Sequence, residues 1–253
     1  MITLPNPFLG DPEIFQNKAP SVKQSNKIKK AGFNGTLIVP ILDESGSMSH
    51  LVKETIDGFN EFVGDQKSSK DKDEDIFFTT VKFEGGNVVT LYDHKHINHL
   101  APLSAQQYNP CGSTNLLDAV GQTVNRVNGY LKTLKKKERP SVLFVIFTDG
   151  GENSSEEYNF EQVKELVGDC ESQDWGFTFF GANIDAFSTG NSFGMNSATT
   201  VQYDTRNTGA TYATASVGAT RFRDMKKAGM TTEEVYTTGL YNDDDRSSTV
   251  GDE

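Results

Sequence analysis

The sequence has few of the residues that build a disulfide framework or a membrane span. Two cysteines, Cys111 and Cys170, are too few for such a framework, so we expect a reducing compartment. The longest apolar run, residues 142–147, is far shorter than the roughly 20 residues that a membrane helix needs. The first residues lack the basic start and apolar run of a signal peptide. These absences predict a cytoplasmic protein.

Positive charge and catalytic motifs are also scarce. The 253 residues include 24 basic and 35 acidic ones, which gives a formal net charge of −11. Nucleic acids and anionic membranes attract positive charge, so we expect the chain to bind neither. The sequence has no Walker-type phosphate loop and no G-x-S-x-G nucleophile elbow. We therefore expect a protein that is not an enzyme.

The chain is long enough for one large domain with appended segments. Prolines at positions 5, 7, 12 and 20 mark residues 1–33 as an N-terminal arm, which is either disordered or packed on the domain or on a partner. Residues 34–230 form the predicted domain, and residues 231–253 are the predicted acidic C-terminal tail. Because residues 242–253 hold five acids and one arginine, we expect them to be solvated.

Short apolar runs alternate with segments whose apolar residues recur at helical spacing. This alternation predicts an α/β fold with a doubly wound, mostly parallel sheet and helices on both faces. Residues 84–87 predict a hairpin that adds one antiparallel edge strand. Pro40 lies in the first strand and cannot donate a ladder hydrogen bond, so we expect a bulge or an unpaired position there. The predicted strands are residues 36–42, 76–83, 88–92, 141–147, 175–180 and 199–203, and the predicted helices are residues 49–66, 114–134, 160–170 and 207–227.

Polar side chains follow the strands that should lie at the centre of this sheet. Asp43, Ser45 and Ser47 follow the first strand, Asp149 follows the strand at 141–147, and Thr114 precedes a helix. Ligands of such folds bind at the carboxyl ends of the strands, so we expect these side chains to converge. Two carboxylates and three hydroxyls suit a hard divalent cation, with Mg²⁺ expected and Mn²⁺ or Ca²⁺ as alternatives. So few charges leave the cation able to accept a carboxylate from another protein.

Three segments, DESGSM, GSTNLLDAV and VIFTDGGEN, resemble the metal-ion-dependent adhesion site (MIDAS) of von Willebrand factor type A (VWA) domains. The resemblance covers roughly residues 35–230. It implies that Ser45 and Ser47 bind the metal directly, that Thr114 does so in the ligand-ready state, and that Asp43 and Asp149 act mainly through water. Glu44 and Glu152 are neighbours of the site rather than expected ligands. The partner implied is a protein that offers an acidic residue.

The later part of the chain, from GANIDAFSTGNSFGM to ATRFRDMKKAG, resembles a bacterial and phage branch of cytoplasmic VWA-like proteins. Relatives of that branch are found beside tellurium-resistance genes, and a phage-encoded member would act in the host cytoplasm. Other interpretations remain open at this point. Asp43, Ser45 and Ser47 could instead be a cluster of helix N-caps. The chain could also be an assembly component of a bacterial or phage complex, or a Mg²⁺-dependent phosphoryl-transfer hydrolase.

A second candidate metal site lies in the histidine-rich run at residues 93–99. His94 and His96 would share one face of a strand, and with Asp93 or His99 nearby they could hold Zn²⁺ or Ni²⁺. The alternative is a polar strand end. Cys111 lies three residues before Thr114, where we expect a structural or incidental role, and Cys170 fits the buried stripe of its helix.

Overall fold

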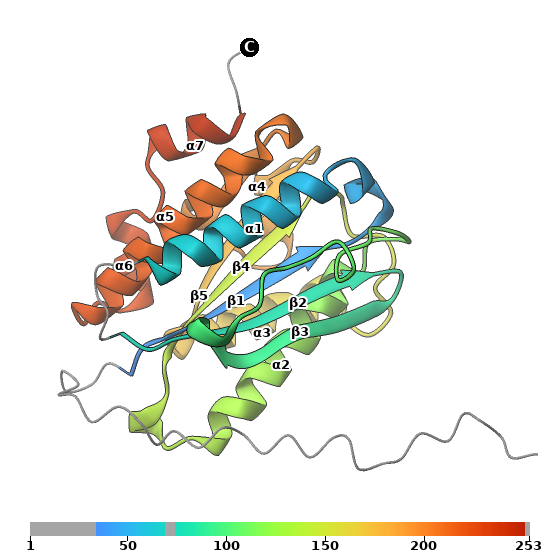
Figure 1. Cartoon of the computed structure of the whole chain (residues 1–253). Helices are drawn as coiled ribbons and strands as arrows, with labels where there is room; N and C mark the ends of the chain where they lie inside the picture. Colours follow the sequence, from blue (N-terminus) through green and yellow to red (C-terminus); the bar gives the residue numbers. More distant parts are fainter. Residues whose placement is uncertain (1–33, 69–73, 251–253) are drawn as a thin grey trace, which may run out of the picture.

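The computed structural model describes residues 34–68 and 74–250, and within them six strands form one sheet in the order β3-β2-β1-β4-β5-β6 (Figure 1). Every neighbouring pair is parallel except β2 and β3. This confirms the predicted doubly wound, mostly parallel sheet with one antiparallel edge strand. The strands are β1 (Thr36–Asp43), β2 (Ile76–Glu84), β3 (Asn87–His96), β4 (Ser141–Thr148), β5 (Gly176–Ala182) and β6 (Thr200–Tyr203).

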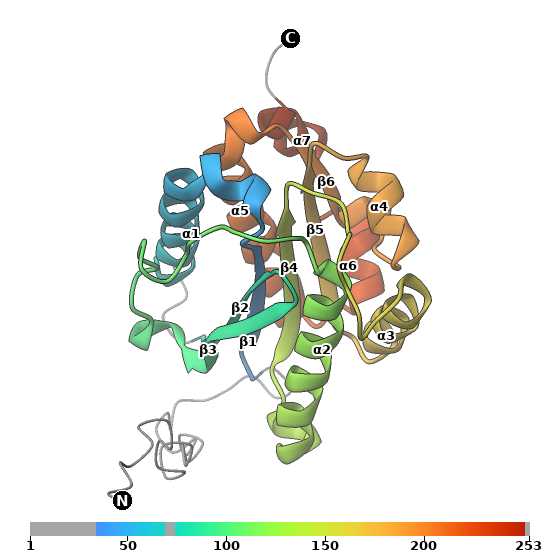
Figure 2. The same cartoon turned by 90° about the vertical axis from the view of Figure 1, so that its right-hand side faces the viewer.

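Helices cover both faces of the sheet. Figure 2 shows α1 and α5 on one side of the strands and α2 and α3 on the other. Because both faces are covered, β1 and β5 are buried along their whole length, which explains their unbroken apolar runs. The helices are α1 (Val52–Lys67), α2 (Leu116–Thr133), α3 (Phe160–Ser172), α4 (Ala186–Ser192), α5 (Thr208–Lys227), α6 (Thr232–Thr238) and α7 (Asp243–Val250).

Pro40 disturbs β1 less than expected. The register of β1 is unbroken on both sides, and Pro40 lies opposite Val145 of β4. No pairing with β2 occurs at Val39 or Pro40, so the predicted unpaired position is confirmed while the alternative, a bulge in β1, is wrong. The register shifts lie one strand further out, where β3 uses two more residues than β2 to span the same pairs.

The C-terminal tail is more ordered than a freely solvated segment, although most of its described residues are exposed. Residues 243–250 form α7, which packs on β6 and α5 (Figure 2). Contacts that the acidic composition does not reveal attach this helix, among them an ion pair between Asp245 and Arg221 of α5. The Arg246 guanidinium donates to the carbonyl oxygens of Ala198 and Thr200, and the Thr249 hydroxyl donates to the carbonyl oxygen of Gln202 at 2.8 Å. They bind carbonyl groups at and beside the edge strand β6, and this holds the helix in place.

Some predictions concern residues that the structure does not describe. The N-terminal arm, residues 1–33, lies outside the described part of the chain, as do residues 251–253. Among the described helices, none has both the length and the apolar character that crossing a bilayer requires.

Candidate metal centre

Asp43 is the last residue of β1 and lies at the carboxyl edge of the sheet. It is 1% exposed. One carboxylate oxygen, Oδ1, accepts a hydrogen bond from the backbone N–H of Ser45 at 2.7 Å. The other, Oδ2, accepts one from the Thr148 hydroxyl at 2.5 Å. These bonds, one from the loop after β1 and one from the end of β4, fix the orientation of the carboxylate.

A chain of side-chain oxygens joins the loop after β1 to the loop after β4. Ser45 Oγ lies 3.0 Å from Ser47 Oγ, and the Ser47 hydroxyl donates to Oδ1 of Asp149 at 2.6 Å. Asp149 follows β4 directly and is buried. Its Oδ2 is also buried and has no hydrogen-bond partner within the described residues. A buried carboxylate oxygen without a partner is costly, and a bound cation would remove that cost.

Thr114 reaches the same place from the loop before α2. Its hydroxyl lies beside Gly150, because a Cβ at Gly150 would be in ordinary van der Waals contact with Thr114 Oγ1 at 3.4 Å and with Ser47 Oγ at 3.6 Å. The two hydroxyls therefore face the same glycine. The structure thus brings together all the residues predicted as metal ligands: Asp43, Ser45, Ser47, Thr114 and Asp149.

The site holds two buried carboxyl groups, those of Asp43 and Asp149. No salt bridge to Asp43 or Asp149 occurs within residues 34–68 and 74–250. The pKa of the Asp43 carboxyl is raised to about 6, first by burial and to a smaller extent by the charge of Asp149, while hydrogen bonds from Ser45 and Thr148 oppose the rise. The donor groups are all oxygens, so the residues fit a hard divalent cation such as Mg²⁺, Mn²⁺ or Ca²⁺.

Glu44 is next to Asp43 in sequence but is committed to other partners. Its carboxylate forms an ion pair with Lys82, whose Nζ lies 2.8 Å from Oε1 and 2.7 Å from Oε2. The same carboxylate accepts a hydrogen bond from the backbone N–H of Asn109. Glu44 therefore fastens the loop that leads to Thr114 onto the end of β1.

Three residues that the sequence analysis does not single out hold the site in place. Thr148 binds Asp43, and the hydroxyl of Tyr108 donates to the backbone carbonyl of Asp43 at 2.5 Å. The side chain of Asn153 accepts a hydrogen bond from the backbone N–H of Thr114 at 2.9 Å. Thr148 precedes Asp149 directly and Asn153 follows it by four positions, so closeness in sequence could have pointed to both residues. Tyr108 is 65 residues from Asp43, and no pattern in the sequence links the two.

The histidine-rich run does not form a second metal cluster. His94 Nδ1 lies 2.7 Å from Asp93 Oδ1, and its ring stacks on Tyr130 with centroids 3.6 Å apart. His96 instead accepts a hydrogen bond from the backbone N–H of Asn98 and packs edge-on against Phe77. Within the described residues, no group of three or more histidine, cysteine or acidic side chains could hold a metal ion. The structure therefore gives no support to the Zn²⁺ or Ni²⁺ site.

The cysteines show no sign of reactivity. Cys170 is buried on α3, as predicted, and burial raises the pKa of its thiol to about 12. Cys111 is exposed, and its hydrogen bond with the Glu84 carboxylate raises the pKa of its thiol. A raised thiol pKa disfavours the nucleophilic thiolate in both cases.

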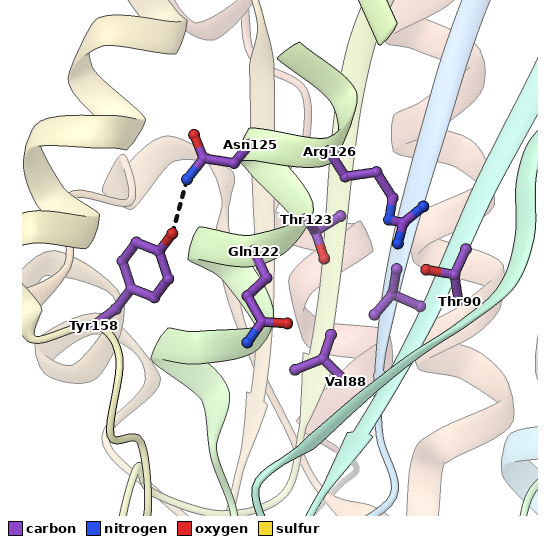
Figure 3. A pocket seen from close by; sticks show the side chains of 8 residues that line it. Val88, Thr90, Gln122, Thr123, Asn125, Arg126 and Tyr158 are labelled. Atoms are coloured by element: carbon purple, nitrogen blue, oxygen red, sulfur yellow. Dashed lines mark hydrogen bonds between the residues drawn. The ribbon is translucent and has the colours of Figure 1, made fainter. Parts of the chain in front are cut away.

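A separate hollow of about 420 Å³ lies between the β2–β3 hairpin and α2 (Figure 3). Asn125 and Tyr158 close one side of it through a hydrogen bond of 2.8 Å. Its charged lining residue, Arg126, lies 3.3 Å from Asp93. None of the five candidate ligands lines this hollow, whose walls are formed by Val81, Val88, Thr90, Gln122, Thr123, Asn125, Arg126 and Tyr158.

Comparison with known proteins identifies similar folds. The chain is similar to proximal thread matrix protein 1 (PTMP1) from the mussel byssus, solved with a zinc-occupied MIDAS motif, at a TM-score of 0.52 and 12% identity. This match covers 73% of the present chain but only 48% of PTMP1. No protein-family model and no curated protein matches the chain. At this identity the likeness shows a shared fold, and the bacterial and phage branch stays a prediction.

Two other solved structures are similar at lower scores. Manganese-loaded TRAP protein from Plasmodium vivax has a TM-score of 0.48 and 15% identity, with 70% of this chain and 71% of that chain covered. A von Willebrand factor type A structure from Catenulispora acidiphila has a TM-score of 0.45 and 13% identity, with 72% and 42% covered.

Proposed function

We propose that the chain is a VWA-type binding module, in which a divalent cation held by Asp43, Ser45, Ser47, Thr114 and Asp149 captures a carboxylate of a protein partner. The observation that carries this proposal is the buried Oδ2 of Asp149, which has no hydrogen-bond partner among the described residues, in a site with a second buried carboxylate. Mg²⁺ is the cation we expect, because oxygen ligands of this kind suit it.

The arrangement of these oxygens supports binding of a partner rather than storage of an ion. If each of the five residues supplies one oxygen, a hard cation that accepts about six oxygens keeps about one coordination position for another group. Ser47 and Gly151 are exposed, so the site opens to solvent on this side. A carboxylate from outside can therefore approach. The fold shared with PTMP1, which was solved with zinc at its own MIDAS motif, agrees with this proposal.

Calorimetric titration of Mg²⁺ and Mn²⁺ into EDTA-treated protein tests the first half of the proposal. We expect one binding event in the wild type and none in Asp43→Ala. Asp57→Ala is the matched control, because Asp57 is an exposed acid on α1, outside the site. Wild-type protein that binds neither cation, or Asp43→Ala that binds as the wild type does, would overturn the proposal.

The second half requires an open coordination position on the bound ion. Mn²⁺ in such a site retains exchangeable water, which strongly enhances the relaxation of solvent protons. We expect this enhancement in the Mn²⁺-loaded protein and expect glutarate, as a simple dicarboxylate probe, to reduce it. A bound Mn²⁺ that causes no enhancement would show a closed site and would contradict partner capture.

A further inference from the structure

Thr114 is held by the loop that follows Asp149. Its backbone N–H donates to Oδ1 of Asn153 at 2.9 Å. Its backbone carbonyl accepts hydrogen bonds from the N–H groups of Asn153 at 3.0 Å and Ser154 at 3.2 Å. Both backbone groups of Thr114 are thus bound by residues that lie four and five positions after Asp149 in the chain.

The same loop also caps the helix that begins just after Thr114. The carboxylate of Glu152 accepts hydrogen bonds from the backbone N–H groups of Leu117 at 2.9 Å and Ser155 at 2.7 Å. The N–H of Asp118 donates to the Ser155 hydroxyl, and the Asp118 carboxylate binds N–H groups of residues 156–158 in return. The start of α2 and the loop after β4 are therefore one hydrogen-bonded unit.

Within this unit, Asn153 makes the side-chain contact nearest the site. Its side chain makes one hydrogen bond, in which Oδ1 accepts from the backbone N–H of Thr114. Because a backbone N–H can only donate, the oxygen of the Asn153 amide faces Thr114. Asn153 itself is exposed, so replacing it removes no core packing. The two backbone bonds to the Thr114 carbonyl remain in any Asn153 variant except proline.

We propose that Asn153 is a positioning residue that sets the Thr114 hydroxyl relative to Asp149, so that both meet the cation together. This inference rests on the function proposed above. Thr114 and Asp149 lie 35 positions apart in the chain, and Asn153, four positions after Asp149, adds a side-chain bond to the backbone bonds that hold Thr114 against this loop. Supporting groups outside the ligand set, when removed, typically reduce metal affinity by about 10-fold to 100-fold.

The test compares Asn153→Ala, Asn153→Asp and Asn159→Ala. Asn159 provides a matched control. It lies in the same segment between β4 and α3, and its Oδ1 also accepts a hydrogen bond from a backbone N–H, that of Gln162 at 3.0 Å, rather than that of Thr114. We expect Asn153→Ala to weaken Mg²⁺ binding by about tenfold, and Asn153→Asp, which keeps the acceptor oxygen, to bind at least as tightly as the wild type. Asn159→Ala should bind as the wild type does.

A second readout needs no metal. In EDTA, amide hydrogen exchange at Thr114 should become faster in Asn153→Ala and stay unchanged in Asn159→Ala, because only the first variant loses the acceptor. In a Thr114→Val background, which lacks the hydroxyl ligand, Asn153→Ala should cause little further loss of Mg²⁺ affinity.

The outcomes separate the two proposals. Wild-type Mg²⁺ binding with unchanged affinity in Asn153→Ala would overturn this inference alone. An equal loss in the wild-type and Thr114→Val backgrounds would do the same, because Asn153 would then act by another route. Absence of Mg²⁺ binding in the wild type would overturn the proposed function and this role with it.

Discussion

Replacing Asp43 by asparagine should stabilise the metal-free protein and at the same time prevent its stabilisation by Mg²⁺. Burial and the nearby charge of Asp149 raise the pKa of Asp43 from 3.8 to about 6 in the folded state. A group with a raised folded-state pKa contributes its stability fully below about pH 3.8, and this contribution is lost as the pH rises through about 6. At neutral pH the charged Asp43 is therefore a cost to the folded state.

The size of this cost follows from the same values. The difference between 3.8 and about 6, at about 1.4 kcal/mol for each pH unit, corresponds to about 3 kcal/mol. Asparagine keeps an oxygen for the Ser45 N–H, and its amide can donate to Thr148, whose hydroxyl can turn to the Gly150 carbonyl 2.9 Å away. Loss of the charge-assisted bonds offsets part of the gain, so we expect a net stabilisation of about 1–3 kcal/mol. For a domain of this size that is a rise in Tm of roughly 2–10 °C.

Thermal denaturation followed by circular dichroism checks this expectation. In EDTA near neutral pH, Asp43→Asn should melt above the wild type, and the gap should shrink as the pH falls toward 4. With Mg²⁺ at about 100 times its Kd, the wild type alone should gain about 2.7 kcal/mol of stability. The difference in Tm between the two proteins should therefore shrink or change sign. Asp57→Asn is the control for removal of an exposed charge. A less stable Asp43→Asn in EDTA, or a gap that does not depend on pH, would refute the reasoning.

Three further predictions concern other parts of the chain. The apparent Mg²⁺ affinity of the wild type should fall by up to about tenfold per pH unit below about pH 6, because protons compete for Asp43, and calorimetry across this range would show it. Glu74→Gln should destabilise the fold by about 1–3 kcal/mol in urea denaturation, since a neutral amide replaces the carboxylate that lies 2.7 Å from the buried guanidinium of Arg223. Arg246→Ala should release α7 and increase amide exchange in β6 while Mg²⁺ binding stays at the wild-type level, and unchanged exchange would contradict the role given to Arg246.

The sheet and the candidate ligands could be predicted because each depends on short-range patterns. Fully apolar runs mark strands that are buried on both faces, and the carboxyl ends of parallel strands meet at one edge. Asp43 and Asp149 therefore had to lie close together once β1 and β4 were placed side by side.

The supporting contacts could not be predicted, because they join residues far apart in the chain that no helical or strand periodicity of the sequence relates. Tyr108 binds the carbonyl of Asp43 across 65 residues, and Asn153 binds Thr114 across 39. The acidic composition of residues 242–253 predicted solvation, but it could not show that Arg246 binds two backbone carbonyls or that Asp245 pairs with Arg221 of α5. The composition of a segment gives its mean charge and polarity, whereas the packing of a short helix depends on the contacts of individual side chains.

The two outer strands of the sheet are protected in different ways, and this limits how another chain can join it. At β6, the short edge is covered by α7, which occupies backbone carbonyls that a new strand would need. At β3, two register shifts interrupt the regular spacing of the ladder, and within one of them His94 adopts a left-handed φ of 50°. Growth of the sheet into a larger assembly by strand addition is thereby disfavoured at both ends. The metal site proposed above lies instead at the carboxyl ends of the central strands β1 and β4, away from both edges of the sheet.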